Sequence, residues 1–242
     1  MTEQPKIDTR PKNLLLAALP DAEYRRLLPH LKKVVLKQGD VLHESDTPAK
    51  SVYFLDEGVA SLSVSNSDGV NLELSIVGNE SVIGERAIFK HGYFIVQCTM
   101  LSDGVSYKIP PKVFRDEFYQ VDALHDLILN HLEARLTETA QTALCNQTHL
   151  IEQRLSRWLL TFADRSHSKK LFLTQELISN ILGTNRPTIS VAAKTLQDKR
   201  LIDYHRGVIS IIDRKGLEKE TCECYKIIKK TVEIYFGLKR RP

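Results

Sequence analysis

Cationic and polar side chains recur at every fourth position in one short segment of the C-terminal half of the chain. Arg186, Ser190 and Lys194 share this spacing, which would place them on one face of a helix. The opposite face would carry four apolar side chains, those of Ile189, Ala192, Ala193 and Leu196. Such a helix fits the major groove of DNA, where one arginine can bind O6 and N7 of a guanine together. The segment is therefore predicted to recognise base edges and phosphates.

The residues around this helix predict the rest of a helix-turn-helix. Thr174 can cap a first helix, Gly183 can end it in the left-handed conformation, and Asn185 can cap the second helix. Pro187 falls in the first turn of the second helix, where a missing N–H costs nothing. Counted from Gln175, the constrained places of the motif hold a small residue, a glycine, a β-branched residue and an alanine, namely Ser179, Gly183, Ile189 and Ala192.

A two-stranded wing is predicted directly after the motif, because residues 201–212 alternate around His205-Arg206-Gly207. We predict that polar and cationic residues of the motif and the wing contact DNA: Thr174, Asn185, Arg186, Pro187, Thr188, Ser190, Lys194 and Arg206. The alternative is an ordinary helical hairpin that serves packing alone.

Charge is distributed unevenly along the 242 residues, whose formal net charge is +4. Residues 1–145 hold 15 basic and 20 acidic side chains, a net of −5, whereas residues 146–242 hold 19 basic and 10 acidic side chains, a net of +9. The second half therefore has an electrostatic reason to approach a polyanion, although a solvated basic surface is the plainer explanation.

Other reactive side chains give weaker signals. The four cysteines, Cys98, Cys145, Cys222 and Cys224, are expected to be free thiols in a reducing cytosol. Cys222 and Cys224 lie in a segment with a helical pattern, and residues two apart on a helix point about 200° apart. We therefore predict no metal site and no cofactor. The chain has no phosphate-binding glycine loop, no His-Glu-x-x-His and no Gly-x-Ser-x-Gly, so we predict that it is not an enzyme.

The elements that must position the motif begin with a β-rich region at residues 1–110. Short β-type runs separated by glycines, with a hairpin pattern at Ser67-Asp68-Gly69, are typical of a small antiparallel barrel or roll. The fold class is thus predicted to be α+β, with an N-terminal antiparallel β-roll, a long dimerisation helix and a C-terminal winged helix-turn-helix. Flanking helices are included in the first domain.

A helical pattern follows from residue 111, and the helix at residues 111–145 is predicted to form the dimer interface. Its apolar stripe comprises Val121, Leu124, Ile128, Leu132, Leu136, Ala140 and Ala143. A second copy of the helix is the simplest cover for the stripe, which gives predicted interface residues Leu124, Ile128, Leu132 and Leu136. Packing of the stripe on the chain's own roll is the alternative. Residues 146–242 are assigned to the DNA-binding domain, with one further amphipathic helix in the tail from residue 214.

The chain resembles the CRP/FNR family of bacterial transcription regulators. The resemblance rests on Gln38-Gly39-Asp40-Val41-Leu42, on Tyr53-Phe54-Leu55 with Gly58, on Val82-Ile83-Gly84-Glu85, and on the stretch from Leu173 to Leu201. It implies a cyclic-nucleotide-binding-like roll, a homodimer on a two-fold site in double-stranded DNA, contact with RNA polymerase, and a small-molecule effector in the roll.

The resemblance also implies an effector pocket, lined by Gly84, Glu85, Arg86, Phe94, Ile95, Val96, Arg135 and Thr139. Members that bind cyclic AMP have an Arg-Ser pair shortly after the Gly-Glu motif, whereas Tyr93-Phe94-Ile95-Val96-Gln97 contains no cation. We therefore expect an apolar wall and an effector other than cyclic AMP or cyclic GMP. Three alternatives stay open: an apolar or aromatic molecule, no effector, or Arg86 as a displaced phosphate ligand.

Two functions are consistent with these patterns. The first is a cytoplasmic, homodimeric, DNA-binding transcription regulator. The second is a ligand-sensing dimeric module whose degenerate helix-turn-helix acts through a protein partner. No apolar run approaches the roughly 18 residues of a membrane span, so no membrane association is expected.

Overall fold

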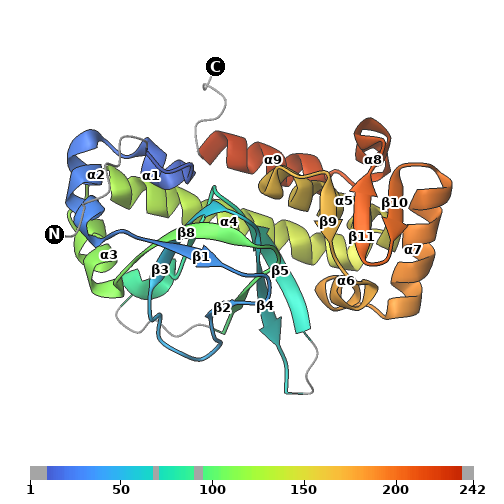
Figure 1. The fold of residues 1–242 in the computed structure, drawn as a ribbon, viewed down its shortest axis with the longest axis horizontal. Coiled ribbons are helices and arrows are strands. Elements are labelled where there is room, and N and C mark those ends of the chain that lie inside the picture. The colour runs from blue at the N-terminus through green and yellow to red at the C-terminus, as the bar shows by residue number, and fades with distance from the viewer. Residues whose placement is uncertain (1–9, 68–70, 90–94, 236–242) are drawn as a thin grey trace.

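The computed structural model describes residues 10–67, 71–89 and 95–235, which form a β-roll, a long helix and a smaller C-terminal unit (Figure 1). Two four-stranded antiparallel sheets build the roll, with the strand orders β1-β8-β3-β6 and β2-β7-β4-β5. The strands are β1 (Lys32–Leu36), β2 (Val41–His43), β3 (Val52–Glu57), β4 (Ala60–Ser65), β5 (Asn71–Val77), β6 (Val82–Ile83), β7 (Gln97–Met100) and β8 (Gly104–Ile109). This confirms the predicted roll and α+β class. Of the predicted hairpin, Asp68 and Gly69 lie outside the described residues.

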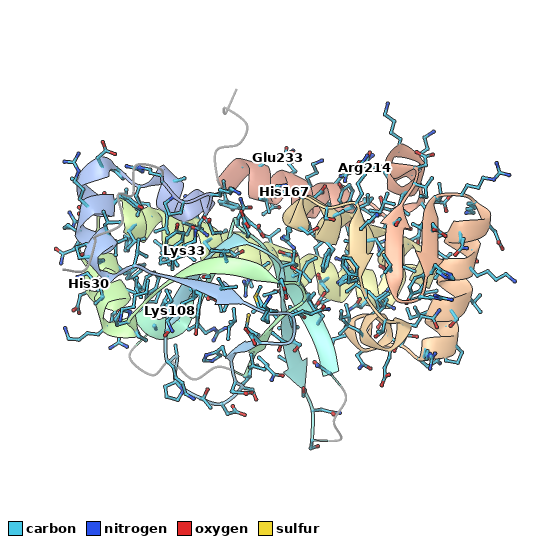
Figure 2. All side chains as sticks on the ribbon, viewed as in Figure 1. His30, Lys33, Lys108, His167, Arg214 and Glu233 are labelled. Carbon is cyan, nitrogen blue, oxygen red and sulfur yellow. The ribbon has the colours of Figure 1, made fainter. Side chains whose placement is uncertain are left out.

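Short helices close one end of the roll. They are α1 (Leu14–Ala18), α2 (Asp21–Leu27), the 3-10 helix η1 (Leu28–His30) and α3 (Pro111–Phe118). Their apolar faces meet the roll in one buried cluster, in which Phe54 of β3 packs edge-on against Phe114 of α3 with ring centroids 6.1 Å apart. Side chains fill the space between the layers (Figure 2).

The long helix starts later than predicted. The prediction of continuous helix from residue 111 is wrong, because α3 ends at Phe118, Val121 adopts a left-handed φ of 59°, and α4 spans Ala123–Thr148. The carboxylate of Glu23, on α2, accepts hydrogen bonds from the backbone N–H groups of Ala123 and Leu124 at 3.1 and 3.0 Å. A side chain distant in sequence thus caps α4 and fixes where it begins.

The orientation of α4 corrects two predicted dimer residues. Leu124 and Ile128 are fully buried in the cluster beneath the roll, and Leu132 packs partly against it. They therefore cover their own roll, the alternative left open by the sequence. Leu136 is 65% exposed, so the stripe divides between two faces of the helix.

The C-terminal unit contains the predicted motif and wing and one strand that was not predicted. Its elements are α5 (Ile151–Ser166), β9 (Lys170–Phe172), α6 (Gln175–Ile181), α7 (Arg186–Asp198), β10 (Ile202–His205), β11 (Val208–Ile211), α8 (Arg214–Glu220) and α9 (Cys224–Tyr235). The wing strands β10 and β11 pair as predicted, and β9 adds a third strand to their sheet. Trp158 is buried in the core of this unit.

The tail forms two helices where one was predicted. Arg214 begins α8 (Figure 2), and its guanidinium binds Asp164 and the Tyr225 hydroxyl at 2.6 and 2.7 Å. The chain then turns, and α9 packs along α4. Among the described residues, no helix combines the length and the apolar character that crossing a bilayer requires.

Buried polar contacts join the roll to the C-terminal unit. Arg165 of α5 binds Glu80, beside β6, at 2.7 Å and Glu138 of α4 at 2.9 and 3.0 Å. A second contact joins the indole N–H of Trp158 to the carboxylate of Glu73 on β5 at 2.6 Å, and the Ser61 hydroxyl donates to the other oxygen of that carboxylate at 2.6 Å.

The Glu73 contact predicts a pH-dependent stability. Burial raises the pKa of Glu73 to about 7, against the lowering effects of Ser61, Trp158 and Arg157. The folded chain then keeps a proton that the unfolded chain releases above its ordinary pKa, so the associated stability is present at low pH and is lost as pH rises through 7. We expect the free energy of unfolding to fall by roughly 1–3 kcal/mol between about pH 5 and pH 8.

Denaturant unfolding of the wild type and of Glu73→Gln over this range measures the effect. The variant should lack the part of the slope that Glu73 supplies, since an amide does not titrate. Parallel pH profiles for the two proteins would contradict the assignment.

Candidate nucleic-acid interface and ligand pocket

Local capping interactions shape the helix-turn-helix as the sequence predicts. The Thr174 hydroxyl accepts a hydrogen bond from the N–H of Leu177 at 3.1 Å, which caps α6. Gly183 ends α6 with a φ of +58°, and Asn185 Oδ1 accepts from the N–H of Thr188 at 2.9 Å to cap α7. These bonds satisfy N–H groups that a helix start leaves without partners.

The predicted contact residues divide into exposed and engaged side chains. Arg186, Pro187 and Lys194 are exposed on α7. Ser190 is partly buried and donates from Oγ to Oε1 of Gln175 at 2.7 Å, so it also fastens α7 to α6. Thr188 likewise donates from its hydroxyl to Asn185 at 2.8 Å.

One exposed residue of α7 was missed. Val191 is 64% exposed, on the side of the helix that faces away from the motif's core. Its sequence signal is an apolar residue out of phase with Ile189, Ala192 and Leu196. An apolar side chain in this place can contact a thymine methyl group in the major groove.

The wing brings a second cation beside the start of α7. Arg186 and Arg206 line one open cleft together with Thr174, Gln175, Glu176, Tyr204 and Gly207. Arg206 and Gly207 form the tight turn between β10 and β11, with φ values of +48° and +79°. Burial raises the pKa of Tyr204, whose hydroxyl donates to the carbonyl of Leu173 at 3.0 Å. The cleft thus presents two guanidinium groups and a neutral phenol on one side of the unit.

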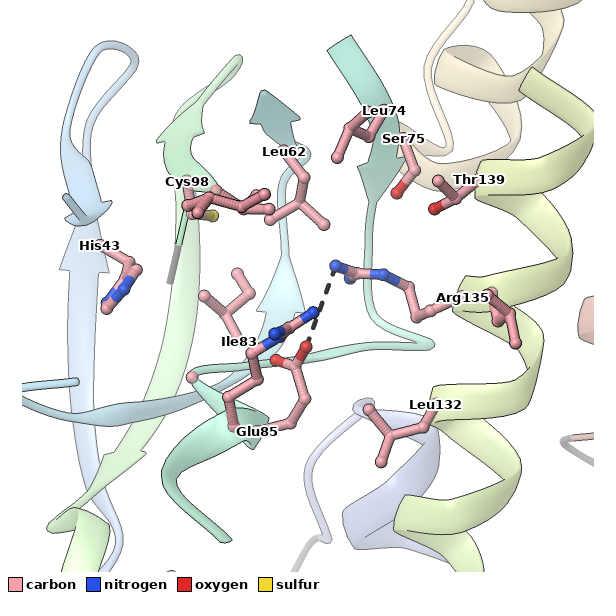
Figure 3. A pocket seen from close by; sticks show the side chains of 15 residues that line it. His43, Leu62, Leu74, Ser75, Ile83, Glu85, Cys98, Leu132, Arg135 and Thr139 are labelled. Carbon is pink, nitrogen blue, oxygen red and sulfur yellow. Dashed lines mark ion pairs between the residues drawn. The ribbon is translucent and has the colours of Figure 1, made fainter. Parts of the chain in front are cut away.

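A second candidate site is a cavity of about 260 Å³ between the roll and α4 (Figure 3). It contains every predicted pocket residue that the structure describes: Gly84, Glu85, Arg86, Ile95, Val96, Arg135 and Thr139. Phe94 lies outside the described residues. Gly84, with a φ of +87°, begins the 3-10 helix η2 (Glu85–Ile88), and a Cβ there would lie 2.7 Å from the carbonyl oxygen of Ser51. No other residue type fits this turn without displacement of the strand.

The cavity combines apolar and charged side chains. Of the expected apolar wall, Ile95 and Val96 line the cavity, although Ile95 is 66% exposed, and Arg86 and Arg135 line it as well. Arg135 reaches in from α4, and its Nη2 lies 4.0 Å from Oε1 of Glu85 (Figure 3). Within the described part of the chain, Nη1 of Arg135 is buried without a hydrogen-bond partner. A buried donor in this condition is suited to an acceptor on a ligand or a water molecule.

Neutral groups also line the cavity. Burial raises the pKa of Cys98 to about 12, so its thiol keeps its proton, and burial lowers the pKa of His43. Ser75 also lines the cavity, with a buried hydroxyl. The charged groups are therefore gathered on the side formed by η2 and α4.

Comparison with known families identifies both units. Residues 33–120 match the family model of the cyclic nucleotide-binding domain, and residues 153–220 match that of the Crp-like helix-turn-helix domain. The two matches together span more than half of the chain. The chain belongs to the CRP/FNR family of transcription regulators. It is a CRP-type DNA-binding regulator and not an enzyme, as predicted.

Relatives match along most of their length. The cAMP-activated global transcriptional regulator CRP of Pasteurella multocida is 23% identical over 195 residues, which cover 75% of this chain and 90% of that protein. CRP of Escherichia coli O157:H7 is 22% identical over 197 residues, covering 75% and 89%.

Solved structures share the fold. FixK2 from Bradyrhizobium japonicum has a TM-score of 0.66 at 16% identity, and the match covers 79% of this chain and 98% of that one. The c-di-GMP responsive regulator CLP of Xanthomonas campestris has a TM-score of 0.65 at 18% identity, covering 79% and 99%.

The cleft predicts different roles for its two arginines. Arg186→Ala should lower the affinity for a selected duplex by about 1–3 kcal/mol and relax the preference at one base pair per half-site, because α7 is the predicted recognition helix. Arg206→Ala should weaken all sequences alike and reduce the salt dependence, because Arg206 in the wing is predicted to contact phosphate.

Binding titrations against the selected site and a scrambled duplex, at two salt concentrations, measure both effects. Lys226→Ala, which removes one exposed cation from α9, is the matched control and should change neither quantity appreciably. Equal losses on both duplexes for Arg186→Ala would contradict base recognition by Arg186.

Proposed function

We propose that this regulator binds a two-fold symmetric DNA site as a homodimer and that a small acidic molecule in the roll controls it. The observation that carries this proposal is the position of Arg135. This residue lies on the helix proposed for dimerisation and reaches into the cavity of the roll. A ligand bound there would contact the roll and the dimer helix at once.

The dimer surface is proposed to be the exposed apolar face of α4. Leu129, Leu136 and Leu144 are 46%, 65% and 49% exposed, at spacings of seven and eight residues. This is close to the repeat at which two helices pack side by side. Since the described part of the chain leaves this face uncovered, a second copy of α4 is the proposed cover. Of the residues predicted from the sequence, Leu136 belongs to this face, and Leu132 lies at its edge.

The division into an effector domain at 1–110 and a DNA-binding domain at 146–242 is kept as part of the proposal, with α3 and α4 in place of the single helix predicted at 111–145. The extension of α4 to Thr148 supports a junction a few residues later. The proposed setting is the cytoplasm, with RNA polymerase as a further partner.

An acidic effector is proposed because the cations of the pocket lie where an anion could reach them. Arg135 offers a buried donor, and Arg86 lines the same cavity. Cyclic-AMP-binding members have their arginine several residues after the Gly-Glu motif. Neither Arg86 nor Arg135 stands at that place, so we do not propose a cyclic nucleotide. The effector differs among similar proteins, because one relative is cAMP-activated and a structural neighbour is c-di-GMP responsive.

The dimer proposal predicts that Leu136→Glu yields monomers. Two symmetry-related carboxylates would be buried at the centre of the helix pair, at a cost of roughly 3–5 kcal/mol. Sedimentation measures the oligomeric state, and duplex binding should weaken with it. Val35→Glu, at an exposed apolar position of β1, is the matched control and should leave the dimer intact. A dimeric Leu136→Glu protein at micromolar concentration would place the interface elsewhere.

The effector proposal predicts weak binding of cyclic AMP and cyclic GMP, with dissociation constants above about 10 μM. Inorganic phosphate and a panel of small mono- and dicarboxylates are the probes for the proposed class. A carboxylate that raises the melting temperature should lose affinity in Arg135→Gln by about 2–5 kcal/mol, or 30- to 4000-fold.

Calorimetry with each nucleotide distinguishes a pocket for another acidic molecule from a pocket for a cyclic nucleotide. Micromolar binding that Arg86→Ala abolishes would contradict the proposal and identify Arg86 as the phosphate ligand. The DNA-binding assignment would be unaffected by that result.

A further inference from the structure

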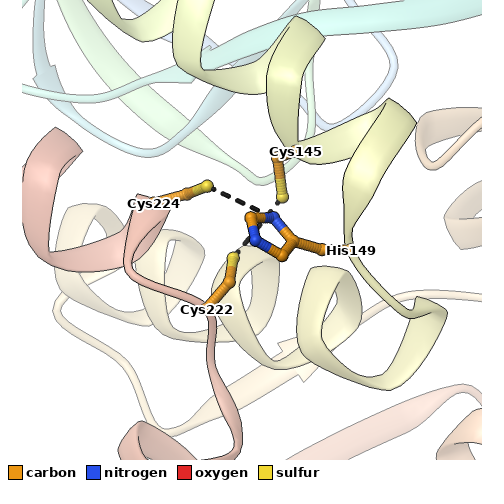
Figure 4. A group of neighbouring side chains, drawn as sticks. All are labelled: Cys145, His149, Cys222 and Cys224. Atoms are coloured by element: carbon orange, nitrogen blue, oxygen red, sulfur yellow. Dashed lines mark hydrogen bonds between the residues drawn. The ribbon is translucent and has the colours of Figure 1, made fainter.

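Three cysteines and one histidine converge where the long helix ends. Cys145 lies in the last turn of α4 and His149 follows that helix, whereas Cys222 precedes α9 and Cys224 is its first residue (Figure 4). Their ligand atoms all lie within 4.8 Å of one another. The prediction that Cys222 and Cys224 share a helix is wrong, because α9 begins at Cys224. The loop before α9 lets both sulfur atoms face the same point, so the geometric argument against a shared metal does not apply.

We propose that Cys145, His149, Cys222 and Cys224 bind one zinc ion. Three thiolates and one imidazole form a tetrahedral donor set that is typical of structural zinc sites. A Zn–S bond of about 2.3 Å places neighbouring ligands of a tetrahedron about 3.8 Å apart. The sulfurs of Cys145 and Cys222 are 3.5 Å apart, and Cys224 Sγ lies 3.5 Å from Nδ1 of His149. Small side-chain rotations therefore suffice to enclose a single ion.

The spacing also distinguishes a single ion from the other chemistries of such a cluster. An iron–sulfur cluster places several atoms between its cysteine ligands and needs a wider cage. A disulfide between Cys145 and Cys222 would use two of the sulfurs and would not explain why Cys224 and His149 lie beside them. Zinc accounts for all four side chains.

The surroundings complete the site. The other nitrogen of His149, Nε2, lies 3.4 Å from the carboxylate of Glu223, an arrangement that orients a metal-binding imidazole and increases its basicity. Gln141 of α4 donates a hydrogen bond to Cys224 Sγ at 3.1 Å. Such contacts hold the ligand atoms in place before an ion arrives.

The charge of the site is balanced locally. Zinc binding releases the three thiol protons to solvent and leaves a net charge of −1 on the ion and its ligands. Arg154 and Arg157 of α5 both interact electrostatically with Cys145, so cations already face the place where this charge would form. All three cysteines are buried, and four protein ligands leave no open position for substrate. The ion would be structural: it would tie the end of α4 to the start of α9.

Metal analysis of the untagged full-length protein tests the proposal. We expect one zinc per chain. Replacement by Co²⁺ should give the visible absorption of a tetrahedral thiolate complex. Chelation should lower the melting temperature, and added Zn²⁺ should restore it.

Matched variants separate the site from the general presence of thiols. Cys222→Ser and His149→Ala should lose the ion or bind it at least tenfold more weakly. His149→Cys should retain one ion with an altered Co²⁺ spectrum, since it only exchanges the donor. Cys98→Ser, which removes the cysteine outside the cluster, should retain one ion. If Cys222→Ser proves insoluble, the chelation experiment on the wild type and Cys98→Ser still decides.

Three results would overturn the proposal. One is protein that takes up neither Zn²⁺ nor Co²⁺ while its thiols are reduced. Another is iron with acid-labile sulfide in anaerobically purified protein, which would indicate a cluster. The third is a Cys145–Cys222 disulfide found by mass spectrometry in protein purified with its thiols protected.

Discussion

The guanidinium of Arg165 lies between two carboxylates that belong to different parts of the molecule. Glu80 comes from the roll and Glu138 from α4, and all three side chains are buried. Three buried charges are tolerable only while they hold one another, because each alone would pay a large desolvation cost. The contact therefore links the roll, the long helix and the DNA-binding unit through charges that cannot separate singly without a large cost. It also allows other arrangements, provided that these charges reach water or new partners together.

Arg135 and Glu138 are three residues apart on α4, so neighbouring turns of one helix contact two different parts of the molecule. Arg135 reaches the cavity of the roll, and Glu138 reaches Arg165 of the DNA-binding unit. The exposed face with Leu136 lies on the same stretch. A displacement of α4 by a bound molecule would thus act at once on the ion contact and on the face proposed for the second subunit.

The sequence predicted the features that depend on local rules. The caps at Thr174 and Asn185 and the left-handed Gly183 follow from residues within one turn of each other, and the structure contains all three. The start of α4 could not be predicted in this way, because its cap, Glu23, lies 100 residues before Ala123. The apolar stripe of α4 is visible in the sequence, but its period does not show whether the stripe packs on the roll of the same chain or on a second subunit. Leu124 and Ile128 were therefore assigned to the wrong interface. The sulfur and imidazole cluster was missed because an irregular turn replaced the expected helix at Cys222 and because Cys145 lies 77 residues before it.

The return of α9 to α4 changes how the DNA-binding unit is attached. The segment between His149 and Cys222 leaves the end of α4 and comes back to the same helix, where α9 packs along it. A unit joined by one linker is free to reorient about that linker, whereas a unit held at both ends must move both attachments together. A reorientation of the recognition helix would therefore have to keep α9 on α4 or break that packing.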